Sequence, residues 1–104
     1  MYYRLFSKNR LIKVTDKVKV SHIFVKKYSE AEQILEELRH GADFNNLAKT
    51  HSLCTTRKDG GKLPEFSKGR MVKEFEDVAF KLNKGEISGV VKTKIGYHII
   101  KREE

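Results

Sequence analysis

The sequence predicts one α+β domain whose helices pack on an antiparallel sheet. Two observations carry this prediction. A strand-like alternation of apolar residues begins at Lys17, two more strand patterns close the chain, and most of the helical periodicity lies between them. The last two strands are joined by a short glycine-containing turn, which makes them an antiparallel hairpin. A chain of 104 residues supports a single hydrophobic core.

The charge composition favours anionic partners without identifying one. The 22 Lys and Arg residues outnumber the 14 Asp and Glu residues, which gives a net charge of +8. The positive residues are scattered along the chain and no nucleic-acid-binding motif accompanies them, so we expect no specific binding to nucleic acid. Hydrophobic residues make up 38% of the chain, which is enough for a folded core.

Cysteine content and hydropathy bear on the compartment. Cys54 is the only cysteine, so no disulfide can form within the chain, and a free thiol suits a reducing compartment. No apolar run approaches the roughly 18 residues that cross a bilayer, and the N-terminus lacks the apolar stretch of a signal peptide. As the chain stands, we expect a soluble, cytoplasmic monomer without a membrane span.

Residues 1–16 follow neither the helix period nor the strand period for long. We expect a short helix that passes into a linker, so that residues 1–16 form an N-terminal extension and residues 17–104 form the domain. The abrupt opening Met1-Tyr2-Tyr3 favours a chain cut from a larger protein.

The first strand is expected over residues 17–25, where apolar side chains alternate. One of its faces carries Val18, Val20, His22 and Phe24. The other face carries Ile23 and Val25 together with the polar residues of the strand. His22 is therefore expected to lie among apolar neighbours.

Two helices follow this strand. Ser29 and Glu32 have the spacing of a capping box, which predicts a helix that starts at Ser29 and ends before Gly41. The buried stripe of this helix consists of Ala31, Ile34, Leu35 and Leu38. Asp43 is expected to cap a second helix that ends near His51. The inward-facing residues of the second helix are Phe44, Leu47 and Ala48.

The stretch 60–75 places apolar side chains among glycines and charged residues, which is unusual for a plain loop. It follows a polar loop over 52–62. Met71 and Phe75 stand four residues apart, so on a helix they share one face, and a small apolar pocket would use that arrangement. A helix is expected to follow Met71 and to end before Gly85. Its buried stripe consists of Phe75, Val78, Ala79 and Leu82.

Strands over 87–93 and 97–102 complete the chain. If the strand at 17–25 pairs with the strand at 97–102, His22 and His98 become cross-strand neighbours. The sequence alone therefore indicates one place where two histidines meet.

Five segments, taken in order, resemble the successive motifs of the parvulin-type peptidyl-prolyl isomerases. They are VSHIFV, ILEELRHGADFNNLAKTHS, GGKLPEFSKGRMVKEFEDVAF, LNKGEIS and KIGYHIIK, and they cover the chain from about Val18 to Arg102. The pattern is most similar to foldase-type parvulins and to bacterial and archaeal parvulins without phosphate specificity. The resemblance implies a parvulin-like, FKBP-like fold, with an antiparallel four-stranded sheet flanked by about four helices.

The resemblance also implies an enzyme. A peptidyl-prolyl cis/trans isomerase accelerates rotation about X-Pro bonds in protein substrates during folding, through a twisted amide and without covalent chemistry, cofactor or metal. Its expected partners are proline-containing polypeptides. Carried over position by position, the implied catalytic residues are His22, Cys54, Thr93 and His98. The implied substrate-binding residues are Leu63, Phe66, Met71 and Phe75.

Other interpretations of these residues stay open. The histidine pair is either catalytic or mainly structural. A cysteine near a histidine also suggests nucleophilic catalysis, although no orienting third residue or oxyanion motif accompanies Cys54. A metal site would need ligand spacing that the histidines and the cysteine lack. The residues considered for such a site are His22, His40, His51, Cys54 and His98.

The competing function is a non-catalytic chaperone module of a larger foldase, which binds extended or proline-containing segments through the same groove. Such a chain is extracytoplasmic if it was excised from a secreted or lipid-anchored foldase. The presence of both histidines, Cys54 and the pocket residues favours an active isomerase.

Two positions depart from the family's usual G-G-D-L-G-x-F motif. Lys62 stands where the motif has an acidic residue, and Pro64 stands where it has a glycine. Pro64 fixes φ at about −65° and removes a hydrogen-bond donor, which alters the local turn. The loop after the first strand, Lys26–Tyr28, is too short for the basic loop of phosphate-directed parvulins. We therefore expect no strong preference for phosphoserine before proline.

Overall fold

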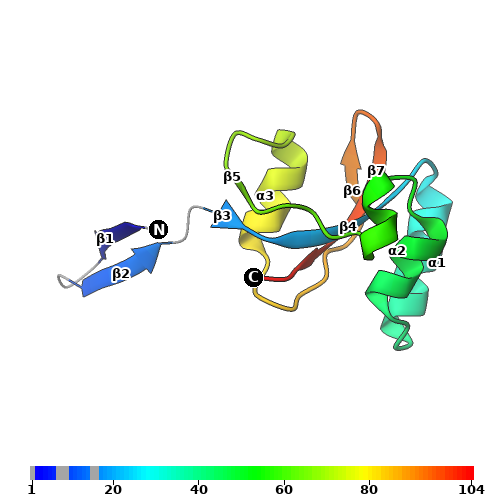
Figure 1. Ribbon diagram of the computed structural model, residues 1–104, viewed down its shortest axis with the longest axis horizontal. Coiled ribbons are helices and arrows are strands. Elements are labelled where there is room, and N and C mark those ends of the chain that lie inside the picture. Colours follow the sequence, from blue (N-terminus) through cyan, green and yellow to red (C-terminus); the bar gives the residue numbers. More distant parts are fainter. Residues whose placement is uncertain (1, 7–9, 15–16) are drawn as a thin grey trace.

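The structure is a computed structural model that describes residues 2–6, 10–14 and 17–104, with side chains from Lys17 onward (Figure 1). The helices of these residues are α1 (Tyr28–Arg39), α2 (Phe44–His51), the 3-10 helix η1 (Thr55–Asp59) and α3 (Lys73–Lys81). The strands are β1 (Tyr2–Phe6), β2 (Arg10–Val14), β3 (Lys17–Val18), β4 (Val20–Val25), β5 (Phe66–Ser67), β6 (Val91–Thr93) and β7 (Gly96–Arg102).

All strand pairs in the described residues are antiparallel, and β7 lies at the centre of the main sheet between β4 and β6. A separate ladder joins β3 to β5. The strand predicted over 17–25 is interrupted at Lys19, whose N–H donates to the Glu104 carbonyl (3.1 Å) and whose carbonyl accepts from the Glu103 N–H (2.8 Å). The α+β class is confirmed, but the expected four-stranded sheet is divided into these two ladders.

The β4–β7 pair separates two hydrophobic clusters. The predicted alternation along the first strand is confirmed, because Val18 and Val20 face one cluster and Ile23 and Val25 face the other. The α3-side cluster comprises Val18, Val20, Phe66, Phe75, Ala79, Val91 and Ile100. The α1/α2-side cluster comprises Ile23, Val25, Ala31, Ile34, Phe44, Ala48 and Ile99. In Figure 1, α1 and α2 lie together and apart from α3.

The ends of α1 and α2 test the predicted caps. The capping box at Ser29 is wrong: α1 begins at Tyr28, and its N-cap, Lys27, makes no side-chain cap bond. The predicted stop is confirmed, since Gly41 adopts a φ of 93° just after the helix. The Asp43 cap of α2 is also confirmed, because its carboxylate accepts a hydrogen bond from the Asn46 N–H at 2.9 Å.

The later part of the chain differs from the predicted elements in two places. The polar loop over 52–62 contains η1. The strand predicted over 87–93 is regular only at β6, and Ile87 makes a single bridge to Lys101. The reason lies at Ser88, whose hydroxyl oxygen accepts a hydrogen bond from the Ile100 N–H (2.9 Å). In a longer regular strand, a backbone carbonyl would accept that bond.

The N-terminal segment is not the helix that we expected. Over residues 2–6 and 10–14 it forms an antiparallel pair, β1 with β2, and this agrees with its tyrosine, isoleucine and valine content. Met1 and residues 7–9 and 15–16 lie outside the described residues. Within the described part of the chain, no helix has both the length and the apolar character needed to cross a membrane.

The contact between Gly61 and β4 is expected to be intolerant of any side chain. Gly61 has a φ of 87°, and a Cβ there would overlap the His22 carbonyl oxygen. Gly41→Ala provides a matched control, because its φ is 93° and a Cβ there would meet nothing within 4 Å. We expect Gly41→Ala to lower the free energy of unfolding by about 1 kcal/mol through backbone strain.

The same strain acts at Gly61, and the overlap adds to it. We therefore expect Gly61→Ala to cost a further 1–3 kcal/mol, roughly the range for overpacking a tight site. Urea unfolding of both variants measures the difference. Equal losses in the two proteins would show that the close approach of Gly61 to β4 is unimportant for stability.

Candidate active site

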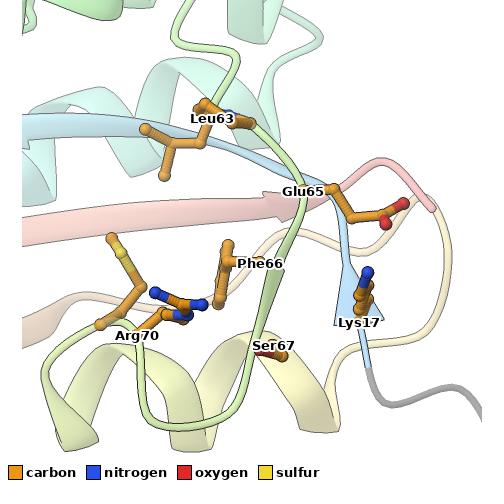
Figure 2. Close-up of a pocket in the computed structure, with 8 residues that line it drawn as sticks. Lys17, Leu63, Glu65, Phe66, Ser67 and Arg70 are labelled. Carbon is orange, nitrogen blue, oxygen red and sulfur yellow. The ribbon is translucent and has the colours of Figure 1, made fainter.

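A pocket of about 370 Å³ lies between residues 63–71 and β3. Leu63, Phe66 and Met71 supply its apolar wall, as the sequence resemblance implied. Figure 2 shows the Leu63 and Phe66 side chains directed into this space. The remaining lining residues are polar, charged or proline: Lys17, Pro64, Glu65, Ser67 and Arg70. An apolar wall with a charged rim suits a small apolar ring that belongs to a polar chain.

Backbone hydrogen bonds to β4 hold one side of this pocket. The His22 N–H donates to the Gly61 carbonyl (2.9 Å), and the Leu63 N–H donates to the Val20 carbonyl (2.9 Å). The segment 61–63 therefore runs beside β4 like a further short strand. Pro64 follows the last of these bonds, so its missing N–H removes nothing from the pairing.

A buried carboxylate holds the other side. A helix follows Met71, as predicted, but Met71 itself lies outside α3, so Met71 and Phe75 do not share a helical face. Instead, the Glu76 carboxylate accepts hydrogen bonds from the N–H groups of Gly69 (3.0 Å), Arg70 (2.8 Å) and Met71 (2.8 Å). These bonds lower the pKa of Glu76 below its usual value, and those from Gly69 and Met71 have the largest effect. Glu76 thus fixes the turn that carries Met71.

Phe75 has a different position from the other three residues assigned to substrate binding. It is 1% exposed and does not line the pocket. Its ring meets His22 and His98 edge-on, with centroids 5.6 and 5.5 Å away, and it lies 6.2 Å from the Phe66 ring. Phe75 therefore connects the pocket wall with the histidine pair.

The two histidines are neighbours across β4 and β7, as predicted. His22 is opposite Ile100, and His98 is opposite Phe24, so the imidazoles are diagonal partners on one face of the sheet. Their Nδ1 atoms are 3.4 Å apart and their rings are nearly parallel, at 15°. One Nδ1 must donate and the other must accept, because two protonated Nδ1 atoms cannot share this contact.

Hydroxyl groups extend the histidine pair at both ends. The Thr93 hydroxyl lies 3.0 Å from His98 Nε2. At the other end, the Thr56 hydroxyl lies 3.5 Å from His22 Nε2.

Burial lowers the pKa of His22 to about 4, and repulsion from His98 adds to this effect. Burial also lowers the pKa of His98, so both rings are neutral at pH 7.

Cys54 lies at the N-cap of η1, half-buried. Its backbone N–H approaches the Ser52 hydroxyl at 3.4 Å, whereas its thiol forms no hydrogen bond with either histidine among the residues described. Thr56, two residues later, takes the contact with His22. The structure therefore brings three of the four residues assigned to catalysis into one network and leaves the Cys54 thiol outside it.

Sequence reasoning missed Thr56 and Glu76. Thr56 lies in the loop over 52–62, which carried no pattern. Glu76 lies in the predicted helix directly after Phe75 but outside its apolar stripe, and its place in the first turn of a helix was the one available signal. Its partners are three amides that precede the helix, and their approach depends on the loop conformation.

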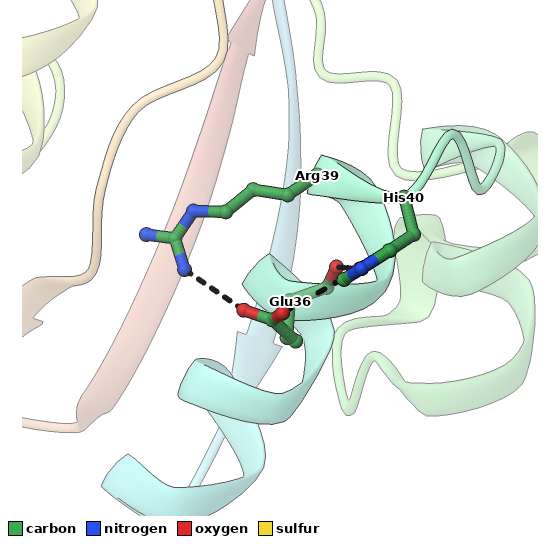
Figure 3. A network of polar contacts seen from close by, with 3 residues as sticks. All are labelled: Glu36, Arg39 and His40. Atoms are coloured by element: carbon green, nitrogen blue, oxygen red, sulfur yellow. Dashed lines mark hydrogen bonds and ion pairs between the residues drawn. The ribbon is translucent and has the colours of Figure 1, made fainter.

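Of the histidines considered for a metal site, only His22 and His98 come together. His40 is the C-cap of α1, and its Nδ1 lies 2.9 Å from the Glu36 carbonyl; Glu36 also pairs with Arg39 at 3.2 Å (Figure 3). His51 is exposed at the end of α2. Over the described ranges, no group of three or more His, Cys, Asp or Glu side chains is placed to hold a metal ion.

Comparison with known proteins agrees with this geometry. The model of the PPIC-type peptidyl-prolyl isomerase (rotamase) domain matches residues 11–104. The chain belongs to the parvulin family. The foldase protein PrsA 1 of Bacillus cereus is 52% identical over 85 residues, which are 81% of this chain and 30% of that protein. The chain thus spans about a third or less of the curated relatives it matches.

Two solved structures extend the comparison. NmPin, the parvulin of Nitrosopumilus maritimus, is 49% identical and has a TM-score of 0.78, and the match covers 88% of this chain and all of NmPin. One of two SurA-like chaperones from Campylobacter jejuni, of which one is described as periplasmic, is 38% identical with a TM-score of 0.79. That match covers 85% of this chain and 38% of the other. The isomerase assignment of this parvulin domain is therefore confirmed, and the non-catalytic alternative is not favoured.

The histidine pair of this parvulin is expected to make its stability depend on pH. In the folded chain the pKa of His22 is about 4, below the value of about 6.5 of an unfolded histidine. Between these two pH values the unfolded chain binds a proton that the folded chain does not bind. The free energy of unfolding should therefore fall by about 3 kcal/mol between pH 6.5 and pH 4. Urea unfolding at half-unit pH intervals measures this loss.

A variant separates this effect from other titrating groups. His22→Gln removes one histidine and should give a shallower pH dependence. The comparison belongs between pH 6.5 and 5, because the lowered pKa of Glu76 costs stability only as the pH falls below the usual range of a carboxylate. An equally steep loss in His22→Gln would rule out His22 as the source.

Glu76→Gln is expected to loosen the turn that carries Met71. A glutamine has one acceptor oxygen and a donor NH₂ in place of the two carboxylate oxygens, so at least one of the three N–H groups loses its partner. Protection of these amides from hydrogen exchange should fall on the order of tenfold, and kcat/KM should fall with it.

Glu74→Gln is the matched control, because Glu74 is exposed in the same first turn of α3 and loses the same charge. Amide exchange followed by NMR, together with kcat/KM, compares the two variants. The assignment fails if Glu74→Gln and Glu76→Gln loosen the turn to the same extent.

Proposed function

We propose that this parvulin domain receives the proline ring of its substrate between Leu63, Phe66 and Met71 and there accelerates rotation about the preceding X-Pro bond. The observation that carries the proposal is the pocket itself: an apolar wall, fixed by backbone bonds on both sides, next to a buried neutral histidine pair. Phe75 supports the wall from beneath. The substrates are proline-containing polypeptides.

The required acceleration is modest. Rotation about a peptide bond has a barrier of about 18–20 kcal/mol, and a 10⁴-fold acceleration needs only about 5.5 kcal/mol of it. No covalent bond is broken. The twisted amide loses resonance, so a pocket that holds the ring and excludes water stabilises it relative to the planar form.

The histidines act, in this proposal, as positioning residues. Each is 5% exposed, and each packs against the Phe75 ring in a T-shaped arrangement. The Thr93 hydroxyl contacts His98 Nε2 and can donate or accept there, so it holds the orientation of the ring in either tautomer. Cys54 is half-buried at the N-cap of η1, two residues before Thr56, and we propose that it adds to the local polarity of the site.

We also propose the wider setting of the chain. Residues 17–104 form the isomerase domain and residues 1–16 an extension, which the placement of the main sheet and all described helices within 17–104 supports. The foldase names of the relatives favour a segment of an extracytoplasmic foldase over a cytoplasmic protein. We propose a monomer, since the proposed site needs no residue beyond those that the structure describes. We expect no specific nucleic-acid partner.

Two expectations on specificity and side reactions accompany this. The loop between β4 and α1 consists of Lys26 and Lys27 alone, so we expect no strong preference for phosphoserine through that loop. A covalent acyl-enzyme on Cys54 is not part of the mechanism. An X-Pro peptide assay by exchange NMR separates isomerase, inert binder and hydrolase in one experiment.

Met71→Ala should lower kcat/KM for an X-Pro peptide by about tenfold, because it removes an apolar contact with the ring worth about 1.4 kcal/mol. Val72→Ala is the control: Val72 is the next residue, is 54% exposed and does not line the pocket. A protease-coupled assay gives both values, and circular dichroism checks the fold. Unchanged kcat/KM in folded Met71→Ala would remove Met71 from the binding site.

A further inference from the structure

A second, more open pocket of about 580 Å³ lies on the same segment as the proline-ring pocket. The two share Leu63 and Pro64, so they are adjacent along the same segment. A substrate polypeptide extends beyond its proline in both directions, at about 3.3–3.6 Å per residue. A residue near the proline is therefore within reach of the second pocket. Its lining residues are Lys49, Thr56, Asp59, Lys62, Leu63 and Pro64.

The charges of this second pocket favour an anion. Lys49, from α2, and Lys62, from the segment beside β4, are both exposed, and neither forms an ion pair with any residue that the structure describes. Asp59 is the one acidic group in the lining. Lys62 also stands where the family's motif has an acidic residue, so this chain has reversed the sign of one charge beside the ring pocket.

The neighbouring groups support the same polarity. Thr56 offers a hydroxyl that can donate to an anion, and this hydroxyl is the one that meets His22. On the far side of Leu63, the rim of the ring pocket carries Lys17 and Arg70 against the single carboxylate of Glu65. Cations therefore outnumber anions along the whole path, which concentrates acidic ligands.

We propose that the second pocket is a subsite for an acidic side chain, Asp or Glu, located one to three residues from the substrate proline. Lys49 and Lys62 hold its carboxylate, and Thr56 donates to it. The inference rests on the proposed function, since it assumes that the proline ring occupies the first pocket. It deepens that function by naming a class of preferred substrates.

The test compares matched peptides. Each carries one proline and either Glu or Gln at a single position, from three residues before to three residues after the proline. Exchange NMR gives kcat/KM for every member at low salt and at about 1 M salt, where screening is strong. We expect Glu to exceed Gln by about threefold at one or more positions, and the ratio to approach one at high salt, since exposed ion pairs are weak and screened.

Variants assign the preference to the lysines. Lys49→Gln combined with Lys62→Gln should bring the Glu/Gln ratio to about one, while Lys84→Gln, which removes a charge outside both pockets, should keep it. Equal kcat/KM for all Glu and Gln pairs, or a ratio that survives in the double variant, overturns the subsite.

Failure of the proposed function has a different signature. The wild-type chain would then turn over none of the peptides, including the Gln series. In that event peptide titrations, followed by the amide signals of Thr56 and Lys62, test the subsite by binding alone. Tighter binding of the Glu peptides than of the Gln peptides supports it, and equal affinities overturn it.

Discussion

The antiparallel pairing of β4 with β7 is the interaction on which the rest of the domain depends. It joins residues 20–25 to residues 97–102, and so closes the longest loop of the fold. Because side chains alternate along both strands, one register decides which face meets α3 and which face meets α1 and α2. A slip by one residue would bury different side chains and would separate His22 from His98.

The pocket depends on this pairing at one remove. Segment 61–63 forms hydrogen bonds with the free edge of β4. The Glu76 carboxylate of α3 fixes the turn that precedes α3 and carries Met71. Apolar side chains can therefore be presented from irregular backbone, which would otherwise not hold a fixed shape. This explains why the stretch looked unusual in sequence: Leu63 and Met71 are placed by their backbone amides, and neither lies on a helix or a strand.

The hydrophobic period of the sequence predicted those features of the fold that depend on residues close together in the chain. The buried positions of the helices, among them Ala31, Phe44 and Ala79, follow the helical period and are buried in the structure. The N-terminal helix was wrong because residues 1–16 contain no sustained period, so propensity was the only guide. Thr56 and Glu76 were missed for another reason: each contacts groups whose approach is set by loop conformation, which no local pattern encodes.

The state of the histidine pair follows from its complete set of partners. Buried polar side chains are costly unless they are hydrogen-bonded, and in the described residues every buried side-chain nitrogen and oxygen has a partner. His22 and His98 bond to each other and to Thr56 and Thr93, so their network is satisfied before any substrate arrives. The two imidazole N–H groups and the two threonine O–H groups supply four donors for these three contacts, so one terminal hydroxyl, that of Thr56 or of Thr93 according to the tautomers, keeps a proton to donate elsewhere. The contribution of the neutral rings is rigidity: both pack against Phe75 in T-shaped arrangements, and Phe75 holds the wall against which the proline ring is proposed to rest.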